Sequence, residues 1–458
     1  DNPEALARAD ALDAERRQKG PRGPLHGVPI LLKDNIATGD RMPTTAGSLA
    51  LAGFRASQDA FVTAQLRRAG AVVLGKTNLS EWANFRSTRS SSGWSSLGGQ
   101  TRNPYALDRS PSGSSSGSGA AASANLCVAA VGTETDGSIV SPAAACGLVG
   151  VKPTVGLVSR AGIIPISRTQ DTAGPMARTV EDAALLLAAM AGPDPADPAT
   201  AGVTAPGLGD ITRLLDAGAL KGARLGVPRN CVWGRHPGTD RVAAAALDTL
   251  RKAGAILVDP VELPTLHRLD EPEMQVLLHE FKAGIEEWLA ALPAAPALPR
   301  TLDALIRLHR DGRAKYMPFF EQEIFEEATK LGPLTTPAYK EALAACRRLA
   351  RDEGIDAAMD RHKLDALVAP TQPPVWLIDL VDGDPSGLPC ASTMPAVAGY
   401  PHITVPAGAV FGLPIGLSFF GRAGSDAKLL RYAFAFEQAH PRRTPPRFAA
   451  TADLGAAT

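Results

Sequence analysis

Helical and strand-like patterns alternate along most of the chain. The stretch TAQLRRAG, with apolar residues at helical spacing, is followed by the β-branched run AVVLG, and ALDTLRKAG is followed by AILVDP in the same way. GVPILLKDNIA, GARLGVP, LDALVAP and HITVPAG are further strand candidates, each apolar and bounded by Gly, Pro or Asp. Helices that alternate with strands cross over between neighbours in a sheet. We therefore predict an α/β fold with one large twisted mixed β-sheet covered by helices on both faces.

The pattern changes between residues 263 and 360, where almost the whole sequence has helical periodicity and is richer in charge. Its clearest amphipathic pieces are LLHEFKAGIEEWLAAL and EALAACRRLARDEGIDAAMDRH. We predict that residues 263–360 form a helical insertion beside the sheet, within a single domain that spans residues 1–458. Such an insertion either shapes specificity at an active site or forms a solvated structural layer, and the pattern does not choose between these roles.

Composition argues against several classes of function. The 458 residues include 47 basic and 47 acidic side chains, and no basic patch for nucleic acid or an anionic membrane is present. No apolar run is long enough for a membrane-spanning helix. Five widely spaced cysteines without a CxxC pair argue against a disulfide framework and a structural zinc site. We expect a monomer with no cofactor, no metal, and no nucleic-acid or membrane partner.

The cellular compartment is not determined by the sequence. Because the first residue is Asp1 rather than Met, we expect an N-terminal segment to have been removed. This expectation favours the bacterial periplasm over the cytoplasm.

Two short motifs suggest activities that their surroundings contradict. Gly70–Thr77 reads GAVVLGKT, which satisfies the phosphate-loop pattern, but a helix precedes Gly70 and the intervening AVVL is itself strand-like. Gly113–Gly117 reads GSSSG, which fits the nucleophile elbow of serine hydrolases with Ser115 at its centre. The polar, proline-broken NPYALDRSPS upstream is not the strand that an elbow requires, and no later histidine lies in a recognisable catalytic setting. Metal-ligand spacing such as HExxH is also absent.

A hydrolase that uses serine without histidine needs another base, and a desolvated lysine can be neutral near neutral pH. Lys33 follows an apolar strand-like run in GVPILLKDN, where an unpaired ammonium would be costly to bury. A lysine at a strand end is more often a surface residue, and serine-glycine runs are usually flexible linkers. The two small-residue patches RSPSGSSSGSG and GTETDGSIV therefore have to be considered together with Lys33.

The stretches VPILLKDN, GSSSGSGAAAS and GTETDGSIVSPAAACGLVGVKPT, in that order, resemble the amidase signature family. The resemblance continues through DTAGPMART, LDALVAPT, AVAGYPHITVPAG and GLPIGLSFFG. It implies a Ser-cisSer-Lys triad, with Ser138 as nucleophile, Ser114 as the bridging cis-serine and Lys33 as base. The two small-residue patches would then be the two serine-bearing loops of one active site, with the catalytic loops within residues 30–175.

The residues around this triad suggest further roles. We expect the successive backbone N–H groups of Thr135, Asp136, Gly137 and Ser138 to hold a tetrahedral oxyanion. Neutral Lys33 would take a proton from Ser114 while Ser114 takes one from Ser138. The carboxylate of Asp136 either hydrogen-bonds substrate or is a structural turn residue.

Three more positions take candidate roles from the resemblance. It implies that the segment after KTNLSE borders the acyl-side pocket, where Asn84 is the candidate for a hydrogen bond to substrate. By their positions in the family motifs, Thr133 and Asp171 are candidates for residues that support the triad.

The chain departs from the commoner family pattern, in which Asp-Ile/Phe-Gly-Gly precedes the nucleophile and Arg follows it two residues later. Here Glu134–Gly137 reads ETDG, and Val140 stands in place of the arginine. With GLVSRAGIIPIS, SRTQDTAGPMAR and LLHEFKAGIEEWL, this combination is similar to peptide amidases, which implies removal of the amide nitrogen from C-terminally amidated peptides. The alternatives are a glutamyl-tRNA amidotransferase A-type subunit, a broad small-amide hydrolase and, from another class, an inactive binding scaffold.

Overall fold

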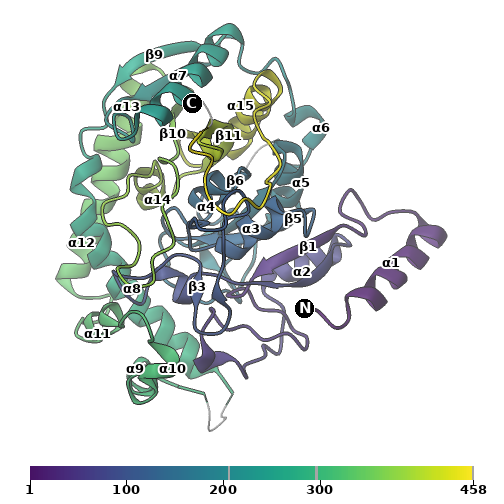
Figure 1. The fold of residues 1–458 in the computed structure, drawn as a ribbon, viewed down its shortest axis with the longest axis vertical. Helices are drawn as coiled ribbons and strands as arrows, with labels where there is room; N and C mark the ends of the chain where they lie inside the picture. Colours follow the sequence, from purple (N-terminus) through teal and green to yellow (C-terminus); the bar gives the residue numbers. More distant parts are fainter. Residues whose placement is uncertain (205–206, 294–297, 456–458) are drawn as a thin grey trace.

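The computed structural model describes residues 1–204, 207–293 and 298–455. Within them, ten strands form one mixed sheet in the order β2-β1-β5-β7-β6-β11-β12-β10-β8-β9 (Figure 1). The strands are β1 (Pro29–Lys33), β2 (Val72–Thr77), β5 (Ala129–Glu134), β6 (Val149–Lys152), β7 (Thr172–Ala177), β8 (Arg224–Pro228), β9 (Ile256–Val261), β10 (Ala366–Pro370), β11 (His402–Val410) and β12 (Leu413–Phe420). A separate two-stranded ribbon consists of β3 (Trp94–Ser95) and β4 (Gly99–Gln100).

The sheet is parallel at its two ends and antiparallel in the middle. At one end, β1 pairs in parallel with both β2 and β5. At the other end, β8 pairs in parallel with β9 and β10. The strands between them, from β5 to β10 in the sheet order, pair in antiparallel fashion. The predicted mixed sheet is confirmed.

Helices cover both faces of this sheet, as predicted. One face packs against α2 (Phe61–Arg68), α5 (Val180–Met190), α7 (Pro237–Lys252) and α15 (Asp426–Ala439), and the other against α3 (Ser116–Ser123) and α4 (Val140–Ala145). In α7, Ala243, Ala246, Leu247 and Leu250 are buried, which is the spacing of a helix with one apolar face. The short α6 (Ile211–Leu214) and α14 (Thr393–Ala398) lie in connections between strands.

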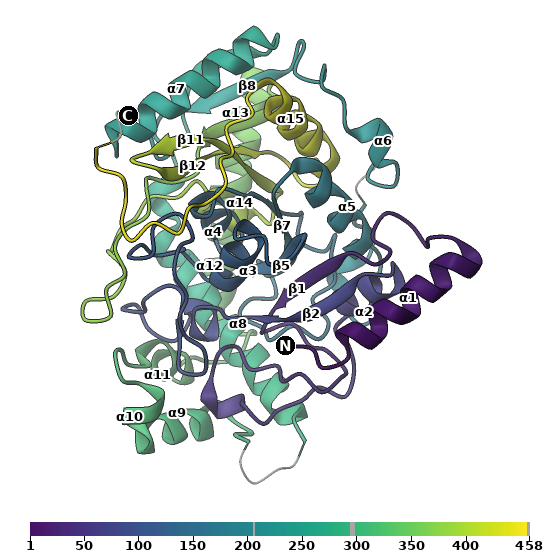
Figure 2. The ribbon, with the colours of Figure 1, turned by 45° about the vertical axis from the view of Figure 1, so that its right-hand side comes forward.

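The elements described between residues 263 and 360 are all helical, and residues 294–297 lie outside the described part. They are α8 (Asp270–Ala291), α9 (Leu302–Asp311), α10 (Arg313–Tyr316), α11 (Glu323–Thr329), α12 (Pro337–Arg347) and α13 (Asp356–His362), with a 3₁₀ turn (Leu266–Arg268) and a π-helical stretch (Arg348–Ile355). Figures 1 and 2 show α9, α10 and α11 together at one end of the molecule, away from α1 (Ala5–Lys19).

These helices share a core with the N-terminal part of the chain. Phe281 of α8 stacks on Phe325 of α11 with ring centroids 5.1 Å apart, and the same apolar cluster includes Leu51, Trp82 and Phe85. The segment 263–360 is therefore packed against the loops that follow β1 and β2.

The phosphate-loop pattern has the structure expected from its context. Helix α2 precedes Gly70, and Val72–Thr77 is strand β2. Lys76 Nζ donates hydrogen bonds to the carbonyl oxygens of Ile36 and Pro43, so its amine is used within the fold. In the described part of the chain, no helix has both the length and the apolar character needed to cross a membrane.

Candidate active site

Two neighbouring parallel strands bring Lys33 to the centre of the candidate site. Lys33 is the last residue of β1, and Thr133 lies near the end of β5, which pairs with β1 in parallel. The carboxyl ends of parallel strands meet at one edge of a sheet. Lys33 is fully buried, and its Nζ lies 2.8 Å from Thr133 Oγ1, 3.1 Å from the Thr133 carbonyl oxygen and 2.8 Å from Ser114 Oγ.

The two serines come from turns that lead into helices on one face of the sheet. Ser114 precedes α3 and Ser138 precedes α4, and their Oγ atoms are 3.0 Å apart. The Gly113–Ser114 peptide bond is cis. A Cβ on Gly113 would lie 2.4 Å from Ser80 Oγ, so a larger residue there would force neighbouring side chains to move. Lys33, Ser114 and Ser138 therefore form one continuous hydrogen-bonded row.

Ser115 has a different place. Its Oγ donates to the Thr133 carbonyl oxygen at 3.0 Å and accepts the Thr133 N–H at 3.2 Å, which fixes the side chain against β5. No strand ends directly before Ser115 in the described chain, in agreement with the interpretation of GSSSG as something other than a nucleophile elbow.

The turn between β5 and α4 holds the predicted oxyanion donors. Gly137 has φ +78°, a conformation that favours glycine. The backbone N–H groups of residues 135–138 have no hydrogen-bond partner within the described residues, whereas Ser141 N–H donates to the Gly137 carbonyl oxygen at 2.8 Å. Four successive N–H groups beside Ser138 are thus free to bind an oxyanion, and this role stays a prediction.

Thr133 and Asp171 both contact the predicted triad region. Thr133 Oγ1 accepts hydrogen bonds from Lys33 Nζ and from Asn35 Nδ2, the latter at 2.9 Å. Asp171 accepts a hydrogen bond from Thr135 Oγ1 at 2.6 Å and from the N–H groups of Ile166 and Ser167 at 2.8 Å each. Asp171 therefore joins the oxyanion turn to the neighbouring segment Ile163–Ser167.

Burial sets the protonation of these groups. Desolvation lowers the pKa of Lys33 to about 7, against the opposing effect of the carboxylates of Glu134 and Asp171. Desolvation likewise raises the pKa of Asp171 to about 6, although its three hydrogen bonds favour the charged form. A large fraction of Lys33 is therefore neutral near pH 7, as a general base must be.

A narrow cavity of about 10 Å³, room for about one water, lies beside Ser138 and Ser114. The residues around it are Asn35, Ala83, Ser114, Thr133, Thr135, Ser138, Arg160, Ile163, Ile164, Ile166, Asp171 and Thr172. Arg160, Ile163 and Asp171 also border a wider groove of about 730 Å³ that reaches Trp288 of α8. The isoleucines of GLVSRAGIIPIS therefore form the cavity wall, a role that sequence reasoning missed because an isoleucine-rich run looks like ordinary core.

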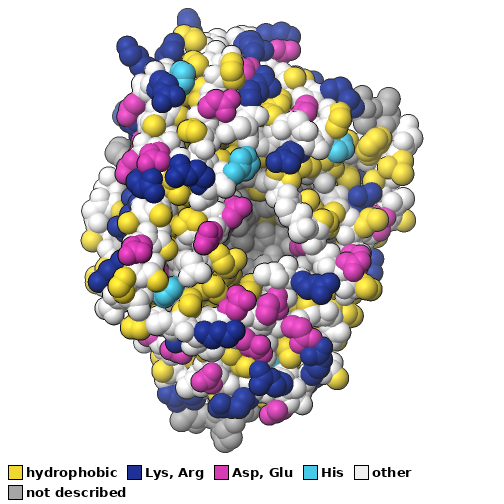
Figure 3. Space-filling model, turned by 90° about the vertical axis from the view of Figure 1, so that its left-hand side faces the viewer, with side chains coloured by type: hydrophobic (Ala, Val, Ile, Leu, Met, Phe, Trp, Pro, Cys, Tyr) yellow, Lys and Arg dark blue, Asp and Glu magenta, His cyan; other side chains and the backbone are white. Residues whose placement is uncertain are grey.

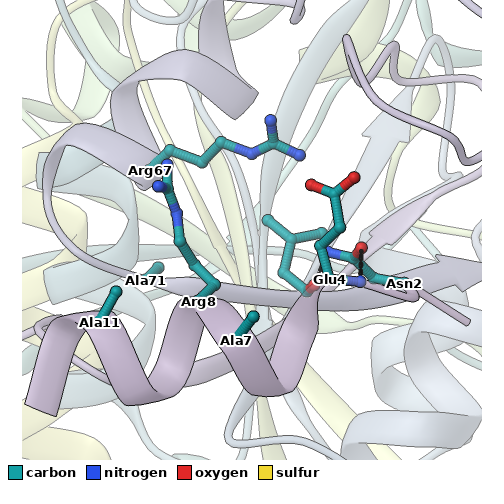
Figure 4. Close-up of a pocket in the computed structure, with 8 residues that line it drawn as sticks. Asn2, Glu4, Ala7, Arg8, Ala11, Arg67 and Ala71 are labelled. Atoms are coloured by element: carbon teal, nitrogen blue, oxygen red, sulfur yellow. Dashed lines mark hydrogen bonds between the residues drawn. The ribbon is translucent and has the colours of Figure 1, made fainter.

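The surface of the molecule is hollowed in more than one place. Figure 3 shows the face that carries α8 and α12, which is hollowed near its middle, with Asp and Glu side chains gathered around the hollow. A pocket of about 310 Å³ lies between α1 and β2, where Figure 4 shows Asn2, Glu4, Arg8 and Arg67 around it. None of its lining residues belongs to the serine–lysine row. Among the described residues, no cluster of His, Cys, Asp and Glu is placed to hold a metal ion.

Asn84 lies beside the site with its amide already engaged. Its Nδ2 donates to Ser92 Oγ at 3.0 Å, and its Oδ1 accepts from Ser90 Oγ at 3.2 Å. The preceding Ala83 lines the cavity instead. A substrate hydrogen bond from Asn84 stays a prediction.

One of the two carboxylate oxygens of Asp136 has a hydrogen-bond partner among the described residues. Its Oδ2 accepts a hydrogen bond from Thr393 Oγ1 at 2.8 Å, whereas Oδ1 is buried without a partner in the described part of the chain. Burial raises the pKa of this carboxyl group. Both interpretations of Asp136, as a turn residue and as a substrate ligand, fit these contacts.

Comparison with known proteins agrees with this geometry. A family model described as Amidase matches residues 1–430. The chain belongs to the amidase signature family. Its structure is similar to the native peptide amidase from Stenotrophomonas maltophilia, with 52% sequence identity and a TM-score of 0.92 over 98% of this chain and 89% of that chain.

Two further amidase signature proteins show the range of functions among relatives. A probable amidase of Arabidopsis thaliana is 42% identical, over 98% of this chain and 84% of that protein. The glutamyl-tRNA(Gln) amidotransferase A-type subunit of Chloroflexus aurantiacus is 38% identical, over 95% of this chain and 87% of that protein.

Proposed function

We propose that this protein hydrolyses carboxamides to the acid and ammonia through an acyl-enzyme on Ser138, and that its substrates are C-terminally amidated peptides. The observation that carries this proposal is the row of Lys33, Ser114 and Ser138, in which a fully buried lysine lies 2.8 Å from one serine and that serine lies 3.0 Å from the next. A neutral lysine at the end of such a row can activate a serine without histidine.

Each step of the reaction has a group in this row. Neutral Lys33 takes the proton of Ser114 while Ser114 takes the proton of Ser138, and Ser138 Oγ forms a bond to the amide carbon. The carbonyl oxygen becomes an oxyanion that the N–H groups of residues 135–138 bind. The proton returns through Ser114 to the amide nitrogen, the C–N bond breaks and ammonia leaves. Water then attacks the ester carbon and its proton passes through Ser114 to Lys33. The bond between the acyl carbon and Ser138 Oγ breaks, the proton returns through Ser114 to Ser138 Oγ, and the acid leaves.

The leaving group must lie near Ser114, because the proton returns to the nitrogen from that oxygen. We place the leaving nitrogen in the narrow cavity, because both Ser114 and Ser138 line it. Ile163, Ile164 and Ile166 close its other side. The cavity is narrow, so a small leaving group such as NH₂ fits it best, which favours terminal carboxamides over internal peptide bonds.

Similarity supports the peptide as substrate. The S. maltophilia protein, which is named a peptide amidase, is 52% identical to this chain over 98% of this chain and 89% of that protein. The alternatives are a broad small-amide hydrolase, an amidotransferase A-type subunit, and a scaffold that binds without turnover.

The test is a panel of amidated di-, tri- and pentapeptides beside acetamide and glutamine, with released ammonia as the readout and mass spectrometry of each peptide product. We expect the amidated peptides to become free acids with no shorter fragments. Cleavage at internal bonds, or turnover of only acetamide or only glutamine, would contradict the peptide assignment. Absence of turnover with every member of the panel would favour the scaffold.

A second experiment tests whether the narrow cavity receives the leaving group. Ile163→Ala shortens a side chain in the cavity wall and should enlarge the cavity. We expect the ratio of kcat/KM for a peptide N-methylamide to kcat/KM for the primary amide to rise about tenfold. Leu185→Ala, a change of similar size on α5 away from the cavity, serves as the control. An unchanged ratio in Ile163→Ala would show that the cavity does not receive the leaving group.

A further inference from the structure

Glu134 is the last residue of β5, and its side chain contacts the turn that carries Ser138, the proposed nucleophile. Its side chain is buried, and Oε2 accepts the backbone N–H of Ile139 at 2.7 Å and of Val140 at 3.0 Å, the two residues that directly follow Ser138. Its other oxygen, Oε1, is buried without a hydrogen-bond partner among the described residues. The carboxylate therefore fixes the shape of the turn that carries both Ser138 and the predicted oxyanion donors.

Burial raises the pKa of Glu134, and a second buried lysine, Lys152, opposes this effect. Lys152 ends β6 and is fully buried, and its Nζ donates to the Pro153 carbonyl oxygen at 3.2 Å. Desolvation lowers the pKa of Lys152 to about 8, while the carboxylates of Glu134, Asp426 and Asp136 act in the opposite direction. Two opposite charges in one water-excluded region stabilise each other, and removing one leaves the other uncompensated.

We propose that Glu134 is a positioning residue for the amide hydrolysis proposed above, which holds the turn that carries Ser138 through the backbone N–H groups of Ile139 and Val140. This inference rests on the proposed function. Val140, which stands in place of the arginine of the commoner family pattern, is fully buried and brings no charge of its own. Within this turn the Glu134 side chain therefore pairs with backbone N–H groups.

The charge of Glu134 acts on the base as well as on the turn. It is one of two carboxylates that raise the pKa of Lys33 against the larger effect of burial, the other being Asp171. The charged and titratable groups that interact with Lys33, Glu134 or Lys152 include Asp136, Asp171, Cys390, His402 and Asp426. Removing the charge of Glu134 should make Lys33 a weaker base that is neutral at lower pH.

The test measures, as a function of pH, the rate at which a fluorophosphonate phosphonylates Ser138 with release of fluoride, because this readout needs no knowledge of the substrate. Glu134→Gln keeps an oxygen that can accept both N–H groups and removes the charge. We expect its acidic midpoint to fall by about 0.5 to 1 pH unit, with a lower plateau rate because the base is weaker. Glu134→Ala, which also frees the turn, should lose about 100-fold in plateau rate.

The matched control is Glu437→Gln. Glu437 of α15 accepts the N–H of Val180 at 2.9 Å, the first residue of α5, so it binds a helix start in the same way far from Ser138. We expect its melting temperature to fall and its pH profile to match that of the wild type. Lys152→Met should also lower the acidic midpoint of Ser138 labelling, because a buried Glu134 without Lys152 takes up a proton and loses its charge.

The outcomes separate this inference from the proposed function. If Glu134→Gln lowers only the melting temperature and keeps the wild-type acidic midpoint, Glu134 is a structural helix cap and the inference is wrong. If the wild type itself is not labelled at Ser138, the proposed function fails instead. A shift of the acidic midpoint in Glu437→Gln equal to that in Glu134→Gln would also overturn the inference, because the effect would not depend on proximity to Lys33.

Discussion

Replacing Lys33 by methionine should stabilise the folded protein while abolishing its activity. Lys33 is fully buried, and burial lowers its pKa from 10.5 to about 7. In the unfolded chain the same lysine stays protonated up to about pH 10.4. Between these two pH values the unfolded state binds a proton that the folded state does not, so the free energy of unfolding rises as the pH rises from 7 towards 10.

The size of the effect follows from the two pKa values. The burial of Lys33 costs the folded state about 4 kcal/mol at pH 7 and about 1.3 kcal/mol at pH 9.5. Methionine has a similar length and no charge, but it gives up the hydrogen bonds of Lys33 Nζ to Ser114 and Thr133, which are worth about 1 to 3 kcal/mol together. We expect Lys33→Met to be more stable by about 1 to 3 kcal/mol at pH 7 and to have no advantage at pH 9.5.

Urea denaturation at pH 7 and pH 9.5 measures this difference, provided that wild type and variant have the same dependence on urea concentration. Ammonia release from an amidated peptide measures activity on the same samples. In the wild type, activity should rise with pH through a midpoint near 7, because only neutral Lys33 accepts a proton. A variant that is less stable than the wild type at pH 7, or a stability difference that does not shrink at pH 9.5, would refute a depressed lysine pKa.

Two other substitutions test the rest of the row. Ser138→Ala should lose nearly all turnover and all labelling by a serine-directed acylating probe. Its melting temperature should stay close to that of the wild type. Labelling at Ser115 in either protein would contradict the assignment of Ser138 as the nucleophile. Thr133→Val removes the hydroxyl that accepts a hydrogen bond from Lys33 Nζ at 2.8 Å, so kcat should fall about tenfold with KM little changed. Steady-state kinetics with one amidated dipeptide measure both constants. A rise in KM alone would mean that Thr133 contributes to substrate binding instead.

The fold class could be predicted because the strands are short apolar runs with clear ends. The runs around Lys33, Val72, Ala366 and His402 are all strands of the sheet. Their order could not be predicted in the same way, because β10 lies between β12 and β8, which are distant in sequence. Pairing between distant strands depends on side-chain packing across the sheet, which a local pattern does not contain.

The site was only partly accessible to sequence reasoning. The order of the family motifs indicates Lys33, Ser114 and Ser138, and the structure brings these three together. Nothing in the small-residue patches themselves distinguishes Ser115 from its neighbours, because the contact that immobilises it is with the backbone of a strand eighteen residues further on. The role of Ile163 in the cavity wall depends likewise on where its loop folds back.

The place of β11 in the sheet has a consequence for the making of the protein. Lys33, Ser114 and Ser138 all lie within the first third of the 458 residues, so the ribosome synthesises them early. Strand β6 pairs with β7 and β11, and it lacks β11 until residues 402–410 have been synthesised. Thr393, which hydrogen-bonds Asp136 beside the nucleophile, is also made late. An interrupted translation product therefore contains every proposed catalytic residue without the walls that hold them in place. The contacts that hold the proposed catalytic residues in place therefore form only after residues 393–410 have been synthesised.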